Sequence, residues 1–442
     1  MKRQPFLNSL LYFMLLSGLT FVSWVFKLDL IGTMTFSLFA FILLIFKKNA
    51  IHVVPVLFNM LFIISRKDWD IASLPMFYFF IPVIIISGFV VHYIRFRKEW
   101  VFGKLTLPFI LLFVGMVLSV LTQHEYHQYQ LFYIAFGLFY LLFYLFFTQT
   151  IHGDQLDYLI QLFFVLGILV SFEVLYHYIS HGDIASSLRE DRVHLGWGLS
   201  NYVATYLIIF IPAAIYFVKN KPLKFLSSIV IAFEILMLLF TLSRGGTLTL
   251  IILTPFLVLY LFYHQKHKLN IVLNVLLIFA LLSMLFIFRT DYIQPLLDRF
   301  YHLDLTDGSG RVDLWRQALQ KFKENPLFGA GVLSRFEGGR FHFYHNTILH
   351  TMASFGLVGL ASLIWQMIVV IILFFKKTNS KIMILFLAIF GANIHGMIDN
   401  VYYQLQFMVI FFVIVAVVEA YHRDQIHQPK IWRLKDAQSY KV

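Results

Sequence analysis

Residues 289–346 read RTDYIQPLLDRFYHLDLTDGSGRVDLWRQALQKFKENPLFGAGVLSRFEGGRFHFYHN, the only long polar run between apolar segments in a chain that is otherwise mostly apolar. Apolar sequence stops at Phe288, just before this run, and starts again at Thr347, just after it. A helix that crosses a membrane needs about 20 mostly apolar residues. We therefore interpret 289–346 as a loop between two membrane helices, and the rest of the chain as a scaffold that holds this loop at one membrane surface.

The loop is expected to contain one helix, at residues 311–324. Apolar side chains recur there at helical spacing along one face, at Val312, Trp315, Leu319 and Phe322. The pair Asn325-Pro326 should end this helix, because proline lacks a backbone donor and disfavours helical geometry in the residue before it. The pattern therefore predicts an amphipathic helix within the loop.

The composition of the whole chain is that of a membrane protein. Of its 442 residues, 60% are hydrophobic and 13% are charged, whereas soluble domains are about half apolar and about a quarter charged. The chain has no cysteine, which excludes disulfides, thiolate nucleophiles and cysteine metal sites. Its start resembles a signal peptide, but the apolar run from Phe6 to Phe26 is too long and lacks a small-residue cleavage site, so we expect a first membrane helix there.

Apolar runs of similar length recur along the chain. They predict roughly fourteen spans, near 6–26, 28–46, 50–65, 75–94, 105–121, 131–149, 158–177, 201–218, 225–242, 247–263, 269–288, 347–375, 382–398 and 401–420. The short runs near the N-terminus are also compatible with re-entrant or merged segments, so about twelve spans is the alternative. The predicted fold is all-α, with residues 1–442 forming one integral membrane domain, a polytopic transmembrane helical bundle.

Lys and Arg residues are unevenly distributed among the connecting segments. With the N-terminus inside, most of them fall in inner segments and few in the short outer loops. Because Lys and Arg accumulate in short cytoplasmic loops, this asymmetry predicts the orientation. Both termini are expected in the cytoplasm, with 421–442 as a short basic tail, and loop 289–346 is expected to be extracytoplasmic. The formal net charge of +12 then reflects membrane topology, and no nucleic-acid partner is expected.

Two arginines of the outer surface are candidates for binding a phosphate group, since the planar guanidinium grips phosphate oxygens in a bidentate way that lysine cannot. Arg244 lies in a tight turn between two apolar runs, where Gly245 and Gly246 would let a bulky anion approach the backbone. Arg311 begins the amphipathic helix, whose first N–H groups also favour anions. The alternatives are snorkelling of Arg244 to lipid headgroups and simple solvation of Arg311.

His345 is the candidate for proton transfer. It directly precedes Asn346, which can cap the helix that starts at Thr347. Histidine titrates near neutrality and can therefore move a proton, although most of the 17 histidines are expected to be interfacial or solvated. No metal site is predicted, because His345 and His350 have the wrong spacing for one helical face and no carboxylate joins them.

The arginines and the histidine make more sense together than separately. The sequence has no ATP motif and no cysteine, so the chemistry it suits is one whose substrate already carries an activated leaving group. Arginines would neutralise a departing diphosphate, and a histidine would activate or orient an acceptor hydroxyl. No nucleotide is needed at the outer surface if the donor is lipid-linked.

Several short motifs in fixed order resemble a known family. They are Ser243-Arg244-Gly245-Gly246, Arg311-Val-Asp-Leu-Trp315, Pro326-Leu-Phe-Gly329-Ala-Gly331, and His345-Asn346 followed by Gly356-Leu-Val-Gly359-Leu. The pattern resembles the O-antigen ligase and polymerase family of bacterial envelope glycosyltransferases. Asn201, with Ala204 before Pro212, is similar to that family's upstream asparagine motif. The resemblance covers residues 196–364, and it is only topological outside them.

The resemblance implies a fold similar to the GT-C glycosyltransferases, a donor glycan carried on undecaprenyl diphosphate, and transfer without nucleotide sugar, metal or cofactor. By motif, Arg244 and Arg311 match the family's diphosphate-binding arginines, and His345 its catalytic histidine. We expect further polar side chains to bind substrate, namely Asn201, Arg316, Arg340 and Asn346. The expected partners are the lipid-linked donor, a glycan or lipid-linked acceptor, and membrane lipids.

Two questions stay open at this stage. A polymerase and a ligase would share the donor and the leaving group, so the arginines do not discriminate between them. A transporter or flippase of lipid-linked glycans is the alternative from another class. It would need functional charges within the spans and an internal repeat. The candidates for such charges are few, namely Glu173, Glu234, His395 and Asp399, and no repeat is evident. The sequence therefore favours an enzyme of the cell membrane.

Overall fold

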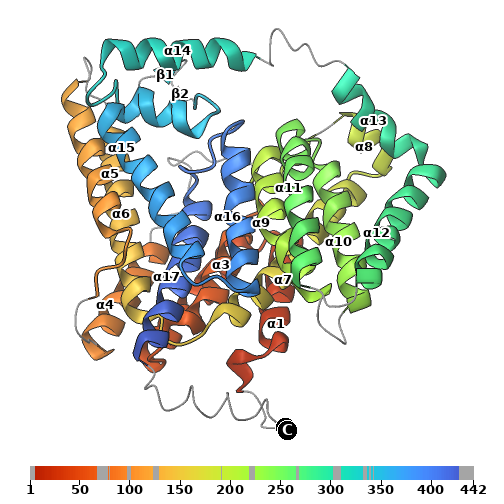
Figure 1. Cartoon of the computed structure of the whole chain (residues 1–442), viewed down its shortest axis with the longest axis horizontal. Helices are drawn as coiled ribbons and strands as arrows, with labels where there is room; N and C mark the ends of the chain where they lie inside the picture. The colour runs from red at the N-terminus through yellow and green to blue at the C-terminus, as the bar shows by residue number, and fades with distance from the viewer. Residues whose placement is uncertain are drawn as a thin grey trace.

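The computed structural model of the chain is a helical bundle with helices lying across one end (Figure 1). It describes residues 5–66, 78, 80–96, 101–122, 129–190, 192–218, 224–264, 268–301, 310–331, 336–337, 340–341 and 343–427. The helices are α1 Leu10–Val25, α2 Asp29–Phe46, α3 Val54–Leu61, α4 Phe80–Phe96, α5 Thr106–Ser119, α6 Tyr129–Thr150, α7 Leu156–Ser180, α8 Ile184–Glu190, α9 Ser200–Val218, α10 Lys224–Phe240, α11 Arg244–His264, α12 Lys268–Phe288, α13 Thr290–Tyr301, α14 Arg311–Glu324, α15 Thr347–Phe375, α16 Ser380–Gly396 and α17 Leu405–His427.

Among the described residues, the short elements are the 3-10 turns η1 Phe6–Asn8, η2 Ala50–Val53 and η5 Val120–Thr122, and a minimal antiparallel pair of strands, β1 Phe336–Glu337 and β2 Arg340–Phe341. By length and composition, 6 helices are apolar enough to cross a membrane, and shorter apolar helices accompany them in the described part of the chain. Every apolar run that the sequence pointed to coincides with one of these helices. The prediction of an all-α polytopic membrane protein is thus confirmed.

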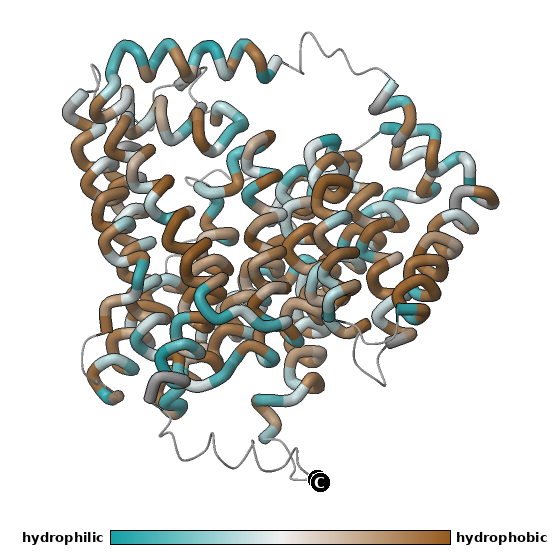
Figure 2. Tube along the Cα trace, viewed as in Figure 1, coloured by the Kyte–Doolittle hydropathy of each residue, from teal (hydrophilic) through white to brown (hydrophobic). Residues whose placement is uncertain are grey.

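Hydrophobic residues dominate the middle of the bundle, and hydrophilic residues gather at its ends and along α14 (Figure 2). The central helices are buried, whereas peripheral helices expose apolar side chains. Almost every residue of α9 is buried, because α7, α10, α11 and α16 pack around it. In contrast, α12 exposes large apolar side chains such as Leu276 (56%) and Phe279 (69%). Exposed apolar side chains on an outer helix suit contact with lipid tails, where they carry no penalty.

The third predicted span, 50–65, is only partly helical, unlike the longer spans. The helical part, Ala50–Leu61, rises only about 18 Å, whereas the hydrocarbon core of a bilayer is about 30 Å thick. The segment nevertheless runs from one end of the bundle to the other. At its start Asn49 Nδ2 donates to the His152 carbonyl (2.7 Å), and beyond its helical part Ser65 Oγ donates to Asp29 Oδ1 (2.7 Å). Residues 62–66, which are not helical, complete the crossing.

The polar run 289–346 contains the predicted helix α14, with the predicted bounds, and also the unpredicted helix α13. The predicted apolar face of α14 needs a correction. Leu319 is 42% exposed, and the buried residue is Ala318, in a small cluster with Tyr344 and Ala353 that Leu314 and Leu349 flank. The reason is that α14 packs along the first turns of α15, and a small residue at 318 permits this close approach.

A break in α15 holds the end of α14 in place. Gly356 has φ 63° and ψ −152° inside α15, so the helix changes direction there, and the segment that follows α14 packs against the break. Ala330 N donates to the Ala353 carbonyl (2.7 Å) and Leu357 N to the Pro326 carbonyl (2.8 Å). Gly329 (φ +73°) is needed because a Cβ there would overlap the backbone of Ser354 and Phe355. The Pro326–Gly331 motif therefore fixes α14 on α15.

Candidate functional site

The turn before α11 presents the first predicted residue. Ser243 caps the helix, since Gly246 N donates to Ser243 Oγ (3.0 Å), and α11 consequently begins at Arg244 instead of at the expected 247. Leu242, two residues before Arg244, has φ 54°, a left-handed conformation that costs a non-glycine residue roughly 1–2 kcal/mol. The chain thus accepts strain to place an arginine at the first residue of a membrane helix.

Arg311 is the first residue of α14 and follows Gly310, whose φ is +74°. Burial lowers the pKa of the Arg311 guanidinium, and the positive charges of Arg244 and Arg192 lower it further, while the Asp399 carboxylate raises it. These groups come from separate segments of the chain and yet act on one another. We call Arg192, Arg244 and Arg311 the arginine cluster. The structure therefore brings together both predicted arginines and adds Arg192, from the segment that leads into α9.

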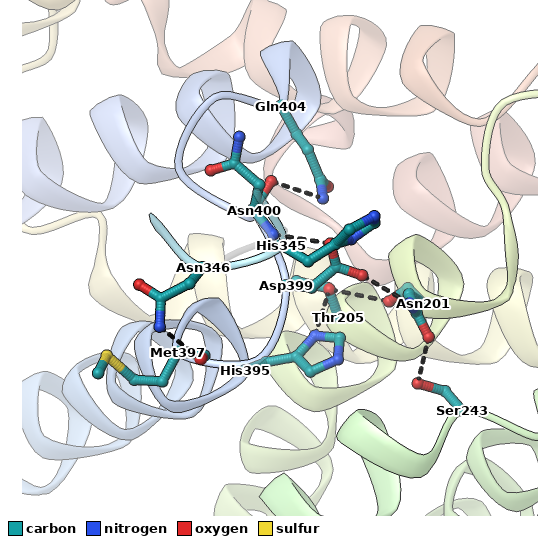
Figure 3. A network of polar contacts seen from close by, with 10 residues as sticks. All are labelled: Asn201, Thr205, Ser243, His345, Asn346, His395, Met397, Asp399, Asn400 and Gln404. Carbon is teal, nitrogen blue, oxygen red and sulfur yellow. Dashed lines mark hydrogen bonds and ion pairs between the residues drawn. The ribbon is translucent and has the colours of Figure 1, made fainter. Parts of the chain in front are cut away.

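His345 lies beside the start of α15 and is held by a carboxylate (Figure 3). Its Nδ1 is 3.0 Å from Asp399 Oδ1, and the side chains are 41% and 4% exposed, respectively. His345 has φ 48°, which is uncommon for a residue with a side chain and is a form of strain that gathers at functional sites. A buried anion therefore holds one nitrogen of an imidazole that itself reaches the surface.

Asp399 is ionised in this setting. Burial raises its pKa, but the hydrogen bond and charge of His345, the charge of His395 and the Asn400 backbone N–H lower it, with a net result of about 2. A carboxylate can only accept, so the His345 Nδ1 carries the hydrogen and donates it. In the neutral imidazole the lone pair is then on Nε2. The pair is arranged so that His345 can take a proton at Nε2.

The two predicted asparagines are bonded to the protein at both ends of their amides. Asn346 caps α15, as expected, by accepting from Leu349 N (3.0 Å), and its Nδ2 donates to the Met397 carbonyl (2.8 Å). Asn201 Nδ2 donates to Asp399 Oδ2 (2.6 Å), and Asn201 Oδ1 accepts from Ser243 Oγ (2.8 Å). Both amides join chain segments around the site.

Two other predicted binding residues stand apart. The side chain of Arg316 is 75% exposed and pairs with Asp313 at 2.8 Å, so the structure does not bring it to the arginine cluster. It lies on an exposed face of α14, whereas the buried Ala318 packs against α15. Arg340 lies in β2, and its side chain is outside the described part of the structure.

Sequence reasoning missed the role of Asp399 and of Arg192. Asp399 was recognised only as an ionisable residue near an apolar run, and its partner His345 is 54 residues away in the chain. A sequence signal did exist, since a carboxylate at the end of an apolar run needs a partner. No feature of the sequence singles out Arg192 from the other basic residues of the loops. Its proximity to Arg311 depends on how the segment before α9 folds back over the bundle.

One comparison with known proteins bears on this arrangement. Residues 227–364 match a family model described as O-antigen ligase. The matched region includes Arg244, Arg311 and His345, whereas Asn201 and Asp399 lie outside it. The comparison with curated proteins finds no match. The match confirms the resemblance that the order of the motifs predicted, and it supports assignment to that family.

Proposed function

We propose that this chain of the O-antigen ligase family is a membrane glycosyltransferase whose donor is a glycan on undecaprenyl diphosphate. The observation that carries the proposal is the arginine cluster next to the His345–Asp399 pair at one end of the bundle. Three guanidinium groups suit a diphosphate, and a carboxylate-held imidazole suits the activation of a hydroxyl. One surface thus offers a group for each role in a glycosyl transfer, arginines for the leaving diphosphate and an imidazole for the attacking hydroxyl.

The proposed step is a displacement at the anomeric carbon of the donor. The acceptor hydroxyl gives its proton to His345 Nε2 as its oxygen bonds to that carbon. The bond from the carbon to the diphosphate oxygen breaks, and undecaprenyl diphosphate leaves with the electron pair. Arg244 and Arg311 neutralise the charge that develops on the leaving group, and Asp399 stabilises the imidazolium that forms. The leaving group supplies the driving force.

We further propose that this end of the bundle faces away from the cytoplasm. The Lys and Arg asymmetry of the connecting segments supports this orientation. The acceptor is then a hydroxyl of a surface glycan or of another lipid-linked molecule. Transfer to a second lipid-linked glycan would make the protein a polymerase, and transfer to a different acceptor would make it a ligase of the O-antigen type.

The test is reconstitution of the full chain in lipid vesicles with the undecaprenyl-diphosphate-linked glycan of its own host. We expect glycan transfer with release of undecaprenyl diphosphate in equal amount. His345→Gln serves as the matched control, because glutamine keeps a similar size and hydrogen bonding but cannot take the proton, and transfer should fall by roughly a hundredfold. Movement of the intact donor between leaflets, with no release of undecaprenyl diphosphate, would show a flippase instead.

A further inference from the structure

Asn201 stands between the two halves of the site (Figure 3). Ser243, directly before Arg244, donates through Oγ to Asn201 Oδ1 at 2.8 Å. Asn201 Nδ2 in turn donates to Asp399 Oδ2 at 2.6 Å. Asp399 Oδ1 accepts from His345 at 3.0 Å. A continuous path of side-chain hydrogen bonds therefore joins the turn that carries Arg244 to the imidazole of His345.

A carboxamide is the group that this position requires. The Ser243 hydroxyl needs an acceptor and the Asp399 carboxylate needs a donor, and an amide offers both on one rigid plane. Aspartate would have the same shape but offers only acceptors when ionised. It would place a second negative charge against Asp399, and like charges in contact repel strongly. A methyl group would make neither bond. A hydroxyl both donates and accepts, but through one atom on a shorter side chain, so it would not reach the two partners that the amide oxygen and nitrogen contact separately.

The backbone of Asn201 is held as firmly as its side chain. Its carbonyl accepts from Thr205 Oγ1 (3.0 Å), and that hydroxyl also bonds His395 Nδ1 (2.7 Å) on α16. His395 is fully buried and lies against α11, where a Cβ placed on Gly245 would be 3.0 Å from its Nε2. These contacts bind α9, α11 and α16 together directly beneath the site. The backbone that carries the Asn201 amide is therefore fixed relative to the helices next to the proposed reacting groups.

We propose that Asn201 is a positioning residue that ties the Arg244 turn to the His345–Asp399 pair, so that the leaving diphosphate and the attacking hydroxyl are held at a fixed separation. This role replaces the expectation that Asn201 binds substrate, because its amide oxygen and one amide hydrogen are used within the protein. The inference rests on the proposed transfer reaction, but its first test does not need a donor.

The charged and titratable groups around the Asn201 amide determine whether a substitution of Asn201 favours or disfavours the protonated form of His345. They are Asp399 and His395 from the α16 end, His345 before α15, and the arginine cluster. In Asn201→Asp, the added carboxylate takes the place of a neutral donor to Asp399. The additional negative charge favours the protonated form of His345. In Asn201→Ala, Asp399 loses one hydrogen-bond donor and relies more on the bond from His345. The protonated form of His345 is then also favoured, but by less than in Asn201→Asp.

The first test measures His345 alone, in the purified full chain without substrate. Diethyl pyrocarbonate modifies only unprotonated imidazole, and peptide mass spectrometry reports each histidine separately. At about pH 7 we expect Asn201→Asp to slow the modification of His345 by about fivefold, relative to the exposed His181 in the same sample. The control is Gln317→Glu, which makes the same charge change on an exposed residue of α14 and should leave the rate unaltered. An unchanged rate in Asn201→Asp and Asn201→Ala would overturn the proposal.

The second test measures transfer. Asn201→Ala should lower kcat by about tenfold while the KM for the lipid-linked donor stays within about twofold, because the side chain orders reacting groups and does not hold substrate. A higher KM with unchanged kcat would make Asn201 a substrate-binding residue and refute the positioning role. If the wild-type chain transfers no glycan, the proposed reaction fails, while the His345 measurement still decides whether Asn201 is coupled to His345.

Discussion

The two ends of the bundle each hold a buried carboxylate, and they use it differently. At one end Glu419 accepts from Lys104 N (2.7 Å), from Tyr144 OH (2.9 Å) and from Thr148 Oγ1 (3.3 Å). These donors lie on or beside α5 and α6, so Glu419 fastens α17 to its neighbours. At the other end Asp399 holds a histidine whose side chain is 41% exposed.

The difference lies in what the buried charge is connected to. Glu419 is bonded to the Lys104 backbone and to the side chains of Tyr144 and Thr148, so it serves the assembly of helices. The charge of Asp399 is linked to a titratable group that a substrate can reach, and the arginine cluster lies near it. A buried carboxylate alone therefore does not mark a reaction site. A buried carboxylate that orients a surface imidazole close to an arginine cluster fits the proposed reaction site.

The largest effect on transfer should come from replacing an arginine of the arginine cluster by lysine, compared with the same replacement at the other end of the bundle. Arg244→Lys and Arg311→Lys would each remove the proposed bidentate contact with diphosphate, and transfer should fall by about a hundredfold. Arg423→Lys is the control at the other end, where Arg423 donates to the Thr148 and Ile151 carbonyls. It should leave transfer within about twofold. Full activity of Arg244→Lys in the vesicle assay would show that this position needs only a positive charge.

Neutralising the two carboxylates tests the comparison directly. Asp399→Asn can donate where Asp399 accepts, so it should favour the wrong tautomer of His345 and lower kcat by about tenfold or more. Glu419→Gln should lower the melting temperature of the purified chain, because it disturbs bonds that hold α17, while transfer per folded molecule stays close to wild type. An equal loss of kcat in Glu419→Gln and Asp399→Asn would contradict the distinction between a carboxylate of the site and one that only holds helices together.

A smaller effect is expected from a matched pair of variants at two glycines with similar φ angles. Gly329 (φ +73°) lies against the backbone of Ser354 and Phe355, whereas Gly153 (φ +79°), at the Glu419 end, has only the Gln155 side chain near the place of a Cβ, at 3.3 Å. Alanine costs roughly 1–2 kcal/mol of backbone strain at either position. Only Gly329→Ala should also displace α14, and with it Arg311, lowering transfer severalfold. Equal transfer by both variants would mean that the docking of α14 is not needed.

The sequence predicted the helices well and the site only in part. Each predicted apolar run coincides with a helix in the part of the chain that the structure describes, since length and hydropathy are local properties. The motifs led to Arg244, Arg311 and His345, because residue type and neighbouring glycines are visible in sequence. The Asp399 partner of His345 was not predicted, because it depends on two turns meeting across 54 residues. The orientation of α14 was mistaken at Leu319 for the same reason, since the helix pattern alone did not show which face meets α15.

The smallest effect on activity is expected of two cysteine variants that assign the two ends of the bundle to the two sides of the membrane. The chain has no cysteine, so single cysteines report without background. Gln317 is exposed on α14 at the Asp399 end, and Lys377 is exposed between α15 and α16 at the Glu419 end. Neither contributes to the site, so Gln317→Cys and Lys377→Cys should transfer glycan normally. In intact cells, permeabilised at any outer membrane, an impermeant thiol reagent should label the cysteine at 317 and not that at 377, which should react only after lysis. The reverse pattern would place the arginine cluster in the cytoplasm, and the donor would then have to be used on that side.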